Sequence, residues 1–318
     1  MENIACRVGF EEETPPWPPA ASEPAPGGSG PERHDGSAGF WLRGPAMEVF
    51  VAVAPVFRLL APREPGGASL TADNTVAQQG LRLACMEPAQ TPTSFEVGNQ
   101  PATVLERTLR GACVRLSPYR GLRYTVTLTL DRSKPLLRLA CDLENLGDGP
   151  RQVACWSVLS FARRGSIVVP WDGQHPPTLP DWTPWPQPGV HLGKHAVAAH
   201  LGGPLHGPAY KVGVVAPPGW IALHRGAEAL VSFSPFEPSA TYPEGGANVT
   251  FFEAEDGAEV SWCEIEHVGP LRWIARGQAV RFTQAVQLVR GVVPASAEPA
   301  ALRAAIESRM LPVVSAAG

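Results

Sequence analysis

Short segments in which apolar and polar residues alternate, as they do in β-strands, recur along most of the chain. They constrain its fold more than any other feature. The clearest is Tyr124–Leu130, which reads Tyr-Thr-Val-Thr-Leu-Thr-Leu. Apolar residues at every second position place one face of a strand against a core and leave the other face polar. Turn residues such as those of Asn145–Pro150 separate the segments and suit antiparallel connections. The pattern predicts an all-β protein.

Many such strands are expected, and one helix. The expected strands are 47–54, 104–109, 112–116, 124–130, 136–145, 151–161, 166–169, 211–215, 220–224, 229–233, 248–252, 259–267 and 279–289. Helical spacing is confined to 299–310, where Leu302, Ile306 and Met310 stand four residues apart after Pro299. Because strands and helices do not alternate, a Rossmann or TIM design is excluded. We predict a large antiparallel β-sandwich with a short C-terminal helix.

Composition divides the chain into three parts. Residues 1–39 are rich in Pro, Gly, Ser, Ala and Glu, and such a segment buries too little apolar area to offset its ordering entropy. We expect a disordered tail there, a β domain over 40–295, and the C-terminal helix with its tail over 296–318. The β domain carries an irregular insertion at 170–209 that is rich in Pro, Trp and His. Its glycines and prolines disfavour the helix that a histidine metal site would need, so no metal is expected.

Charge and cysteine usage exclude several classes of partner. The net charge of −4 provides no basic field for nucleic acid or anionic lipid. No apolar run approaches the length of a membrane span. The six cysteines lack CxxC spacing and mostly sit in apolar runs, which indicates buried free thiols and a reducing compartment. Residues 1–10 lack a basic segment followed by an apolar core, so we expect a soluble cytoplasmic protein.

Residues 261–271 hold the best candidate for a functional site. With a period of two, Trp262, Glu264 and Glu266 lie on one face of a strand. The other face is expected to be mainly apolar, with Cys263, Ile265 and Val268. Carboxylates accept hydrogen bonds from hydroxyl groups, and an aromatic plane packs on the C–H face of a sugar ring. The alternative is a solvated face at the edge of a sheet.

Four passages, taken in order, resemble a known group of proteins. They are Gly80-Leu81-Arg82-Leu83 before Glu87-Pro88, the asparagine turn of 143–150 running into Cys155-Trp156, Lys211-Val212-Gly213-Val214 before Gly219-Trp220, and Tyr242-Pro243-Glu244-Gly245-Gly246 before Glu264-Ile265-Glu266 and Gly269-Pro270-Leu271. Their order resembles that of the galactose-mutarotase-like superfamily, the β-supersandwich of carbohydrate-active proteins. More narrowly, the chain looks like an uncharacterised bacterial domain family within that superfamily.

The resemblance implies that a sugar or oligosaccharide binds in a concave sheet. Arg82 and Lys211 match family positions that often carry a cation, so we expect both to face the cleft; the alternative is a pair of surface cations. Trp262 and Tyr242 are the expected aromatic contacts; the alternative for Tyr242 is a place in the core, but its position after Phe233-Ser234-Pro235-Phe236 favours the rim of the cleft. No cofactor is expected, because opening a sugar ring needs only proton transfer.

The chemistry that the resemblance implies is incomplete. Mutarotation needs a base and an acid, which in aldose 1-epimerases are a glutamate and a histidine. Glu264 or Glu266 matches the glutamate, but the strand that carries the histidine in true epimerases reads Cys-Trp-Ser-Val-Leu-Ser-Phe over 155–161. We therefore expect a carbohydrate-binding protein, with a role in carbohydrate metabolism. Two alternatives stay open: an epimerase-like or other sugar-modifying enzyme with a glutamate base, and a structural or partner-binding β domain.

Overall fold

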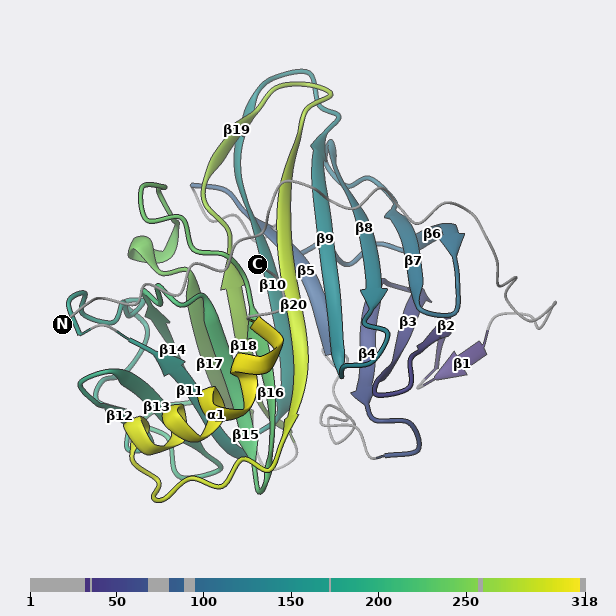
Figure 1. Ribbon diagram of the computed structural model, residues 1–318. Coiled ribbons are helices and arrows are strands. Elements are labelled where there is room, and N and C mark those ends of the chain that lie inside the picture. The colour runs from purple at the N-terminus through teal and green to yellow at the C-terminus, as the bar shows by residue number, and fades with distance from the viewer. Residues whose placement is uncertain are drawn as a thin grey trace.

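Strands with one apolar face pair into two ten-stranded antiparallel sheets (Figure 1). The structure, a computed structural model, describes residues 32–34, 36–67, 80–88, 95–171, 173–256 and 260–314. Sheet A runs in the order β1-β2-β3-β4-β5-β10-β18-β17-β14, with β19 paired to β10. Sheet B runs in the order β12-β13-β11-β15-β16-β20-β9-β8-β7-β6. The predicted all-β sandwich is confirmed.

The strands of sheet A are β1 (Glu32–His34), β2 (Ser37–Arg43), β3 (Glu48–Ala54), β4 (Arg58–Arg63), β5 (Gly80–Met86), β10 (Arg151–Ala162), β14 (Ala209–Val214), β17 (Val249–Asp256), β18 (Val260–Val268) and β19 (Arg272–Ile274). Those of sheet B are β6 (Ala102–Arg107), β7 (Gly111–Leu116), β8 (Leu122–Leu130), β9 (Leu136–Asn145), β11 (Gly165–Pro170), β12 (Val190–Leu192), β13 (Ala196–Leu201), β15 (Trp220–Arg225), β16 (Glu228–Phe233) and β20 (Ala279–Arg290).

The main core fills the space between the two sheets. Most strands contribute alternate side chains to it, as β5 does with Leu81 and Leu83 and β18 with Cys263 and Ile265. The residues between them therefore point to the outer face of sheet A. Five cysteines in the described residues are free, four of them buried, in agreement with the expected thiols. Cys6 lies outside the described residues.

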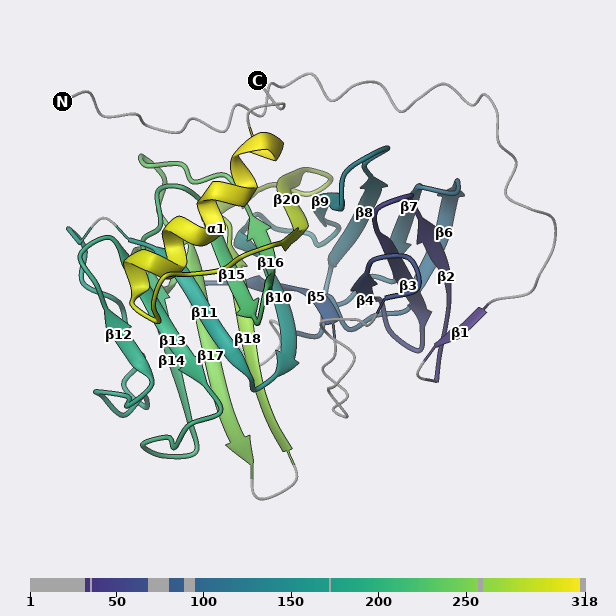
Figure 2. The same cartoon turned by 60° about the horizontal axis from the view of Figure 1, so that its bottom comes forward.

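The C-terminal helix α1 (Pro299–Val314) lies across the outer face of sheet B (Figure 2). Leu302, Ile306 and Met310 are all buried there in a second apolar cluster that includes Trp220 and Val289. The helix predicted over 299–310 is confirmed. No helix among the described residues is long and apolar enough to cross a membrane.

The described residues differ from the expected division of the chain at two places. Strand β1 and the start of β2 lie within the segment expected as a tail, and Phe40 and Leu42 of β2 reach the core between the sheets; residues 1–31 and 35 lie outside the described residues. The insertion at 170–209 is not wholly irregular, since it contains β12 and β13. Strand β13 is rich in alanine, a poor strand former, and it is held by packing between β11 and β12 and against α1.

Candidate functional site

A cavity of about 1160 Å³ opens on the outer face of sheet A, on the side away from the main core. Side chains of β5, β10, β14, β17 and β18 form its floor, and three loops form its walls. The floor consists of Arg82, Met86, Trp156, Lys211, Phe252, Trp262, Glu264 and Glu266. The walls consist of Phe95, Asn99, Thr178, Leu179, Pro180, Asp181, Trp182, Glu244 and Gly245.

The register of the strands brings the charged residues of the floor together. Glu264 lies opposite Ser160 of β10 on one side and Phe252 of β17 on the other. Arg82 lies opposite Val158, two residues along β10, so its side chain reaches Glu264 diagonally across that strand. Diagonal neighbours in a sheet are within reach of long side chains. The site is therefore built on paired strands rather than on loops.

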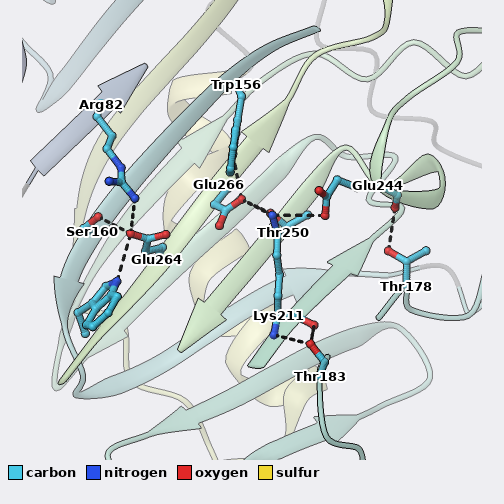
Figure 3. A network of polar contacts seen from close by, with 11 residues as sticks. Arg82, Trp156, Ser160, Thr178, Thr183, Lys211, Glu244, Thr250, Glu264 and Glu266 are labelled. Atoms are coloured by element: carbon cyan, nitrogen blue, oxygen red, sulfur yellow. Dashed lines mark hydrogen bonds and ion pairs between the residues drawn. The ribbon is translucent and has the colours of Figure 1, made fainter. Parts of the chain in front are cut away.

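Glu264 is held by three donors through a single oxygen. Arg82 Nη2 donates to its Oε1 at 2.7 Å, Ser160 Oγ at 3.0 Å and Trp262 Nε1 at 3.2 Å (Figure 3). Its Oε2 has no hydrogen-bond partner among the described residues. Burial is the main cause that raises the pKa of Glu264; Arg82 opposes the shift and the charge of Glu266 adds to it.

Glu266 likewise uses only one of its carboxylate oxygens to accept hydrogen bonds from the described residues. Its Oε2 accepts from Trp156 Nε1 at 2.9 Å and from Thr250 Oγ1 at 2.5 Å, and it lies 3.1 Å from Lys211 Nζ (Figure 3). Lys211 Nζ also lies 3.3 Å from Glu244 Oε2. Desolvation lowers the pKa of Lys211, but the charges of Glu266 and Glu244 outweigh it, and the net shift is upward. Lys211 therefore remains a cation.

Each cation of the floor also lies over an aromatic ring. The guanidinium carbon of Arg82 is 4.9 Å from the centre of the Phe95 ring, and Lys211 Nζ is 4.8 Å from that of Trp156. Such contacts stabilise a desolvated cation by roughly 0.5–2 kcal/mol. Both cations are thus engaged by a carboxylate and a ring.

A second group of aromatic rings lines the other part of the cavity. The ring of Phe252 lies 5.8 Å from that of Trp262 and 6.3 Å from that of Trp182. Trp182 comes from the insertion and is 55% exposed at the cavity rim. Among the tryptophans of the insertion, Trp182 lines the cavity.

Two glycines allow the walls to approach the sheet. A Cβ at Gly98 would lie 1.5 Å from the carbonyl oxygen of Leu83, so the loop that carries Phe95 and Asn99 packs directly on β5. A Cβ at Gly213 would lie 2.2 Å from Thr178 Oγ1. A larger residue at either position would displace a wall of the cavity.

Five of the six predicted site residues lie together in the cavity lining: Arg82, Lys211, Trp262, Glu264 and Glu266. The alternative of a solvated face at a sheet edge is wrong, because β18 lies between β10 and β17 and both carboxylates are buried. Among the described lining residues there is no histidine.

Tyr242 does not line the cavity. It is buried, its ring stacks on Phe236 at 5.3 Å, and its hydroxyl accepts a hydrogen bond from the Glu237 amide at 2.8 Å. The expected face of Val268 is also wrong. Val268 is separated from Glu264 and Glu266 by even numbers of residues, so it shares their face, where it packs in a small outer cluster with Trp156.

Several lining residues were not predicted, chiefly Trp156, Phe252, Glu244 and Phe95. A period of two along β10 and β17 would have placed Trp156 with Ser160, and Phe252 with Thr250, on the outer face. Glu244 and Phe95 stand in loops, where the sequence gives no signal of direction. Their place in the site comes from tertiary packing.

Comparisons with known proteins agree with the fold. No protein-family model and no curated protein matches the chain. Among solved structures, a candidate aldose 1-epimerase from Escherichia coli K12 has a TM-score of 0.51 at 12% identity, covering 80% of this chain and 100% of that one. A protein from Synechocystis sp. PCC 6803 has a TM-score of 0.54 at 10% identity, covering 83% and 99%.

A galactose mutarotase related enzyme from Lactobacillus acidophilus has a TM-score of 0.50 at 7% identity, covering 80% of this chain and 98% of that one. At these identities the likeness concerns the fold and not the activity. The chain has the galactose-mutarotase-like fold, and the resemblance seen in the sequence is confirmed at that level.

Proposed function

We propose that the protein binds a carbohydrate in the cavity on sheet A. The observation that carries this proposal is the combination of oriented, buried carboxylates with aromatic rings in one lining. Hydroxyl groups of a sugar donate to carboxylate oxygens, and the C–H faces of the ring pack on tryptophan or phenylalanine. The open cavity supports a ligand-binding protein over a purely structural β domain.

The size of the cavity favours an oligosaccharide. At about 1160 Å³ it exceeds the usual range of roughly 300–1,000 Å³ for small-molecule sites. The floor is preorganised, because its ion pairs and hydrogen bonds join adjacent strands. The side chains of a preorganised site lose little conformational entropy when a ligand binds.

The test is a glycan-array screen of the folded full-length chain, followed by calorimetric titration of each glycan that binds. We expect a Kd below about 1 mM for at least one glycan. Glu264→Gln and Trp262→Ala should each weaken binding by about tenfold or more, a change of about 1.4 kcal/mol. Binding by no glycan on the array would contradict the proposal.

Two control variants test whether these losses are local. Glu144 also pairs with an arginine, Arg123, but lies on sheet B, so Glu144→Gln should leave the Kd unchanged. Trp273 is 67% exposed and absent from the cavity lining, so Trp273→Ala should also leave it unchanged. Equal losses in a control and its matched variant would indicate a general effect on folding.

A second candidate function is proton transfer at the anomeric centre of a bound sugar. The raised pKa of Glu264 and its unoccupied Oε2 favour this carboxylate as a general base. Saturation-transfer NMR on a sugar that binds should then show faster anomer exchange with the wild type. Glu264→Gln and Glu266→Gln should abolish the acceleration, and unchanged rates in both variants would exclude this activity.

A further inference from the structure

The cavity repeats one arrangement twice: a carboxylate, a cation of the chain and an aromatic ring. Glu264, Arg82 and Phe95 form the first set. Glu266 and Lys211 form the second with the ring of Trp156. In each set the cation lies between a negative charge and the negative face of a ring.

A third group in the lining has rings and a carboxylate, but no cation of the described residues accompanies them. Trp182, Phe252 and Trp262 form a continuous aromatic wall, and no cation of the described residues lies over any of these rings. Asp181 precedes Trp182 at the exposed rim and has no ion-pair partner in the described part of the chain. Glu264 pairs with Arg82 through Oε1, which also receives a hydrogen bond from Trp262, and its Oε2 has no hydrogen-bond partner among the described residues.

The charge balance of the lining points the same way. The described lining residues include two cations, Arg82 and Lys211, against the four carboxylates of Asp181, Glu244, Glu264 and Glu266, an excess of two negative charges when all are ionised. The cation Arg58 is absent from the lining; it donates to Asn99 at 2.8 Å, and its charge interacts with those of Arg82 and Glu96. The lining therefore disfavours an anionic ligand and favours a cationic one.

We infer that the carbohydrate ligand carries a protonated amine, as in a hexosamine unit. Its ammonium group lies against the wall of Trp182, Phe252 and Trp262 and is neutralised by Asp181 and Glu264. This inference rests on the proposed function and specifies the chemical class of the sugar. A neutral sugar satisfies the hydroxyl contacts alone, and a uronic acid or sugar phosphate is repelled by the excess of carboxylates.

The experiment compares matched sugars with the full-length chain by calorimetric titration at pH 6. The probes are glucosamine, N-acetylglucosamine, glucose and glucuronic acid, with β-1,4-linked tetramers of the first three. We expect the amine form to bind with a Kd about tenfold lower than its acetylated and hydroxyl counterparts, within the range for a desolvated cation on an aromatic ring. Glucuronic acid should bind most weakly.

Asp181→Asn should reduce the preference for the amine to about threefold or less, in line with the loss of one partly exposed charge. Asp148→Asn is the control, because the Asp148 side chain is 95% exposed and lies outside the cavity lining. It should leave the preference unchanged.

The outcomes separate this inference from the proposed function. Equal or tighter binding of the acetylated, hydroxyl or acidic sugars overturns the inference and leaves carbohydrate binding intact. If none of these probes binds, the glycan-array screen tests the inference instead. Binding only of neutral or acidic glycans on the array overturns the inference. An array without hits overturns both.

Discussion

Arg82 and Glu264 lie 182 residues apart in the chain and are joined across strand β10 by a hydrogen bond of 2.7 Å. Their side chains are only 9% and 6% exposed. Removing two charges from water costs several kcal/mol per ion, and their mutual attraction offsets that cost only while both partners are present. The pair fixes the orientation of the carboxylate more than it stabilises the fold.

This arrangement predicts an asymmetric pattern of stability. Arg82→Met should lower the free energy of unfolding by about 3–5 kcal/mol, because it leaves Glu264 buried without its cation. The double variant Arg82→Met/Glu264→Gln should be more stable than Arg82→Met alone, since the uncompensated charge is gone. Urea unfolding of the wild type, Arg82→Met and the double variant measures these free energies. The pair of Arg123 and Glu144, whose side chains are 25% and 29% exposed, is the control, and Arg123→Met should cost less than about 1 kcal/mol. Equal costs at the two sites would contradict the interpretation.

The pKa of Glu264 predicts how sugar binding depends on pH. Burial raises this pKa above the ordinary value, so Glu264 takes up a proton at a higher pH than an exposed glutamate does. Protonation removes the negative charge that attracts the hydroxyl donors of a sugar, so binding should weaken as the pH falls. The weakening should occur at a pH above about 4.3, the ordinary pKa of a glutamate. Calorimetric titration between pH 4 and 8 gives the profile. Glu264→Gln should bind more weakly but with a flatter profile; an unchanged profile would assign the pH dependence to another group.

A buried histidine on the opposite face of β18 predicts a loss of stability in acid. Burial lowers the pKa of His267 to about 4, although the backbone of Ser232 opposes the shift. Between pH 6.5 and 4 the unfolded chain therefore binds a proton that the folded chain does not, and stability falls as the pH decreases. Through His267, the free energy of unfolding falls by about 3 kcal/mol at pH 4, and it is unchanged above pH 7.

Between pH 6.5 and 4, the free energy of unfolding of the wild type should fall by about 3 kcal/mol more than that of His267→Gln, because the variant lacks this titrating group. The exposed His206 provides the control: His206→Gln should follow the wild-type profile. A wild-type curve that is flat between pH 6.5 and 4 would contradict the assignment.

The close approach at Gly213 predicts that its substitution disturbs the cavity wall. Gly213→Ala places a Cβ 2.2 Å from Thr178 Oγ1, and the loop that carries Thr178 must move away from β14. We expect a loss of about 1–3 kcal/mol in the free energy of unfolding and at least about tenfold weaker sugar binding. Gly149→Ala is the matched control, since a Cβ there meets no atom within 4 Å. Unchanged binding in Gly213→Ala would show that the wall is not part of the site.

The floor of the site was largely predictable from the sequence, and its walls were not. Residues Glu264 and Glu266 follow the period of two in a strand whose core side is mainly apolar, so their common face could be predicted. Tyr242 stands in a loop, where the sequence does not fix the direction of a side chain, and the structure turns it towards Phe236.

Two of the strands that were missed, β2 and β13, share a physical cause. The expected list began with 47–54 and omitted β2, because Gly39 and the preceding proline-rich segment mask its apolar pair Phe40 and Leu42. Half of strand β13 is alanine, a residue that carries little strand signal. In both cases packing against the rest of the sheet determines the structure, and local composition does not reveal that packing.

The insertion that forms one wall of the cavity also covers the outer edge of sheet A. Strand β14 is the last strand of that sheet, and its free backbone groups at Lys211 and Gly213 bond with Thr183 and Thr178. An uncovered strand edge recruits strands from other molecules and leads to aggregation. Shortening the insertion to widen access to the cavity would therefore expose this edge, and a truncated protein would tend to self-associate. The same loop therefore forms a wall of the cavity and covers the edge strand.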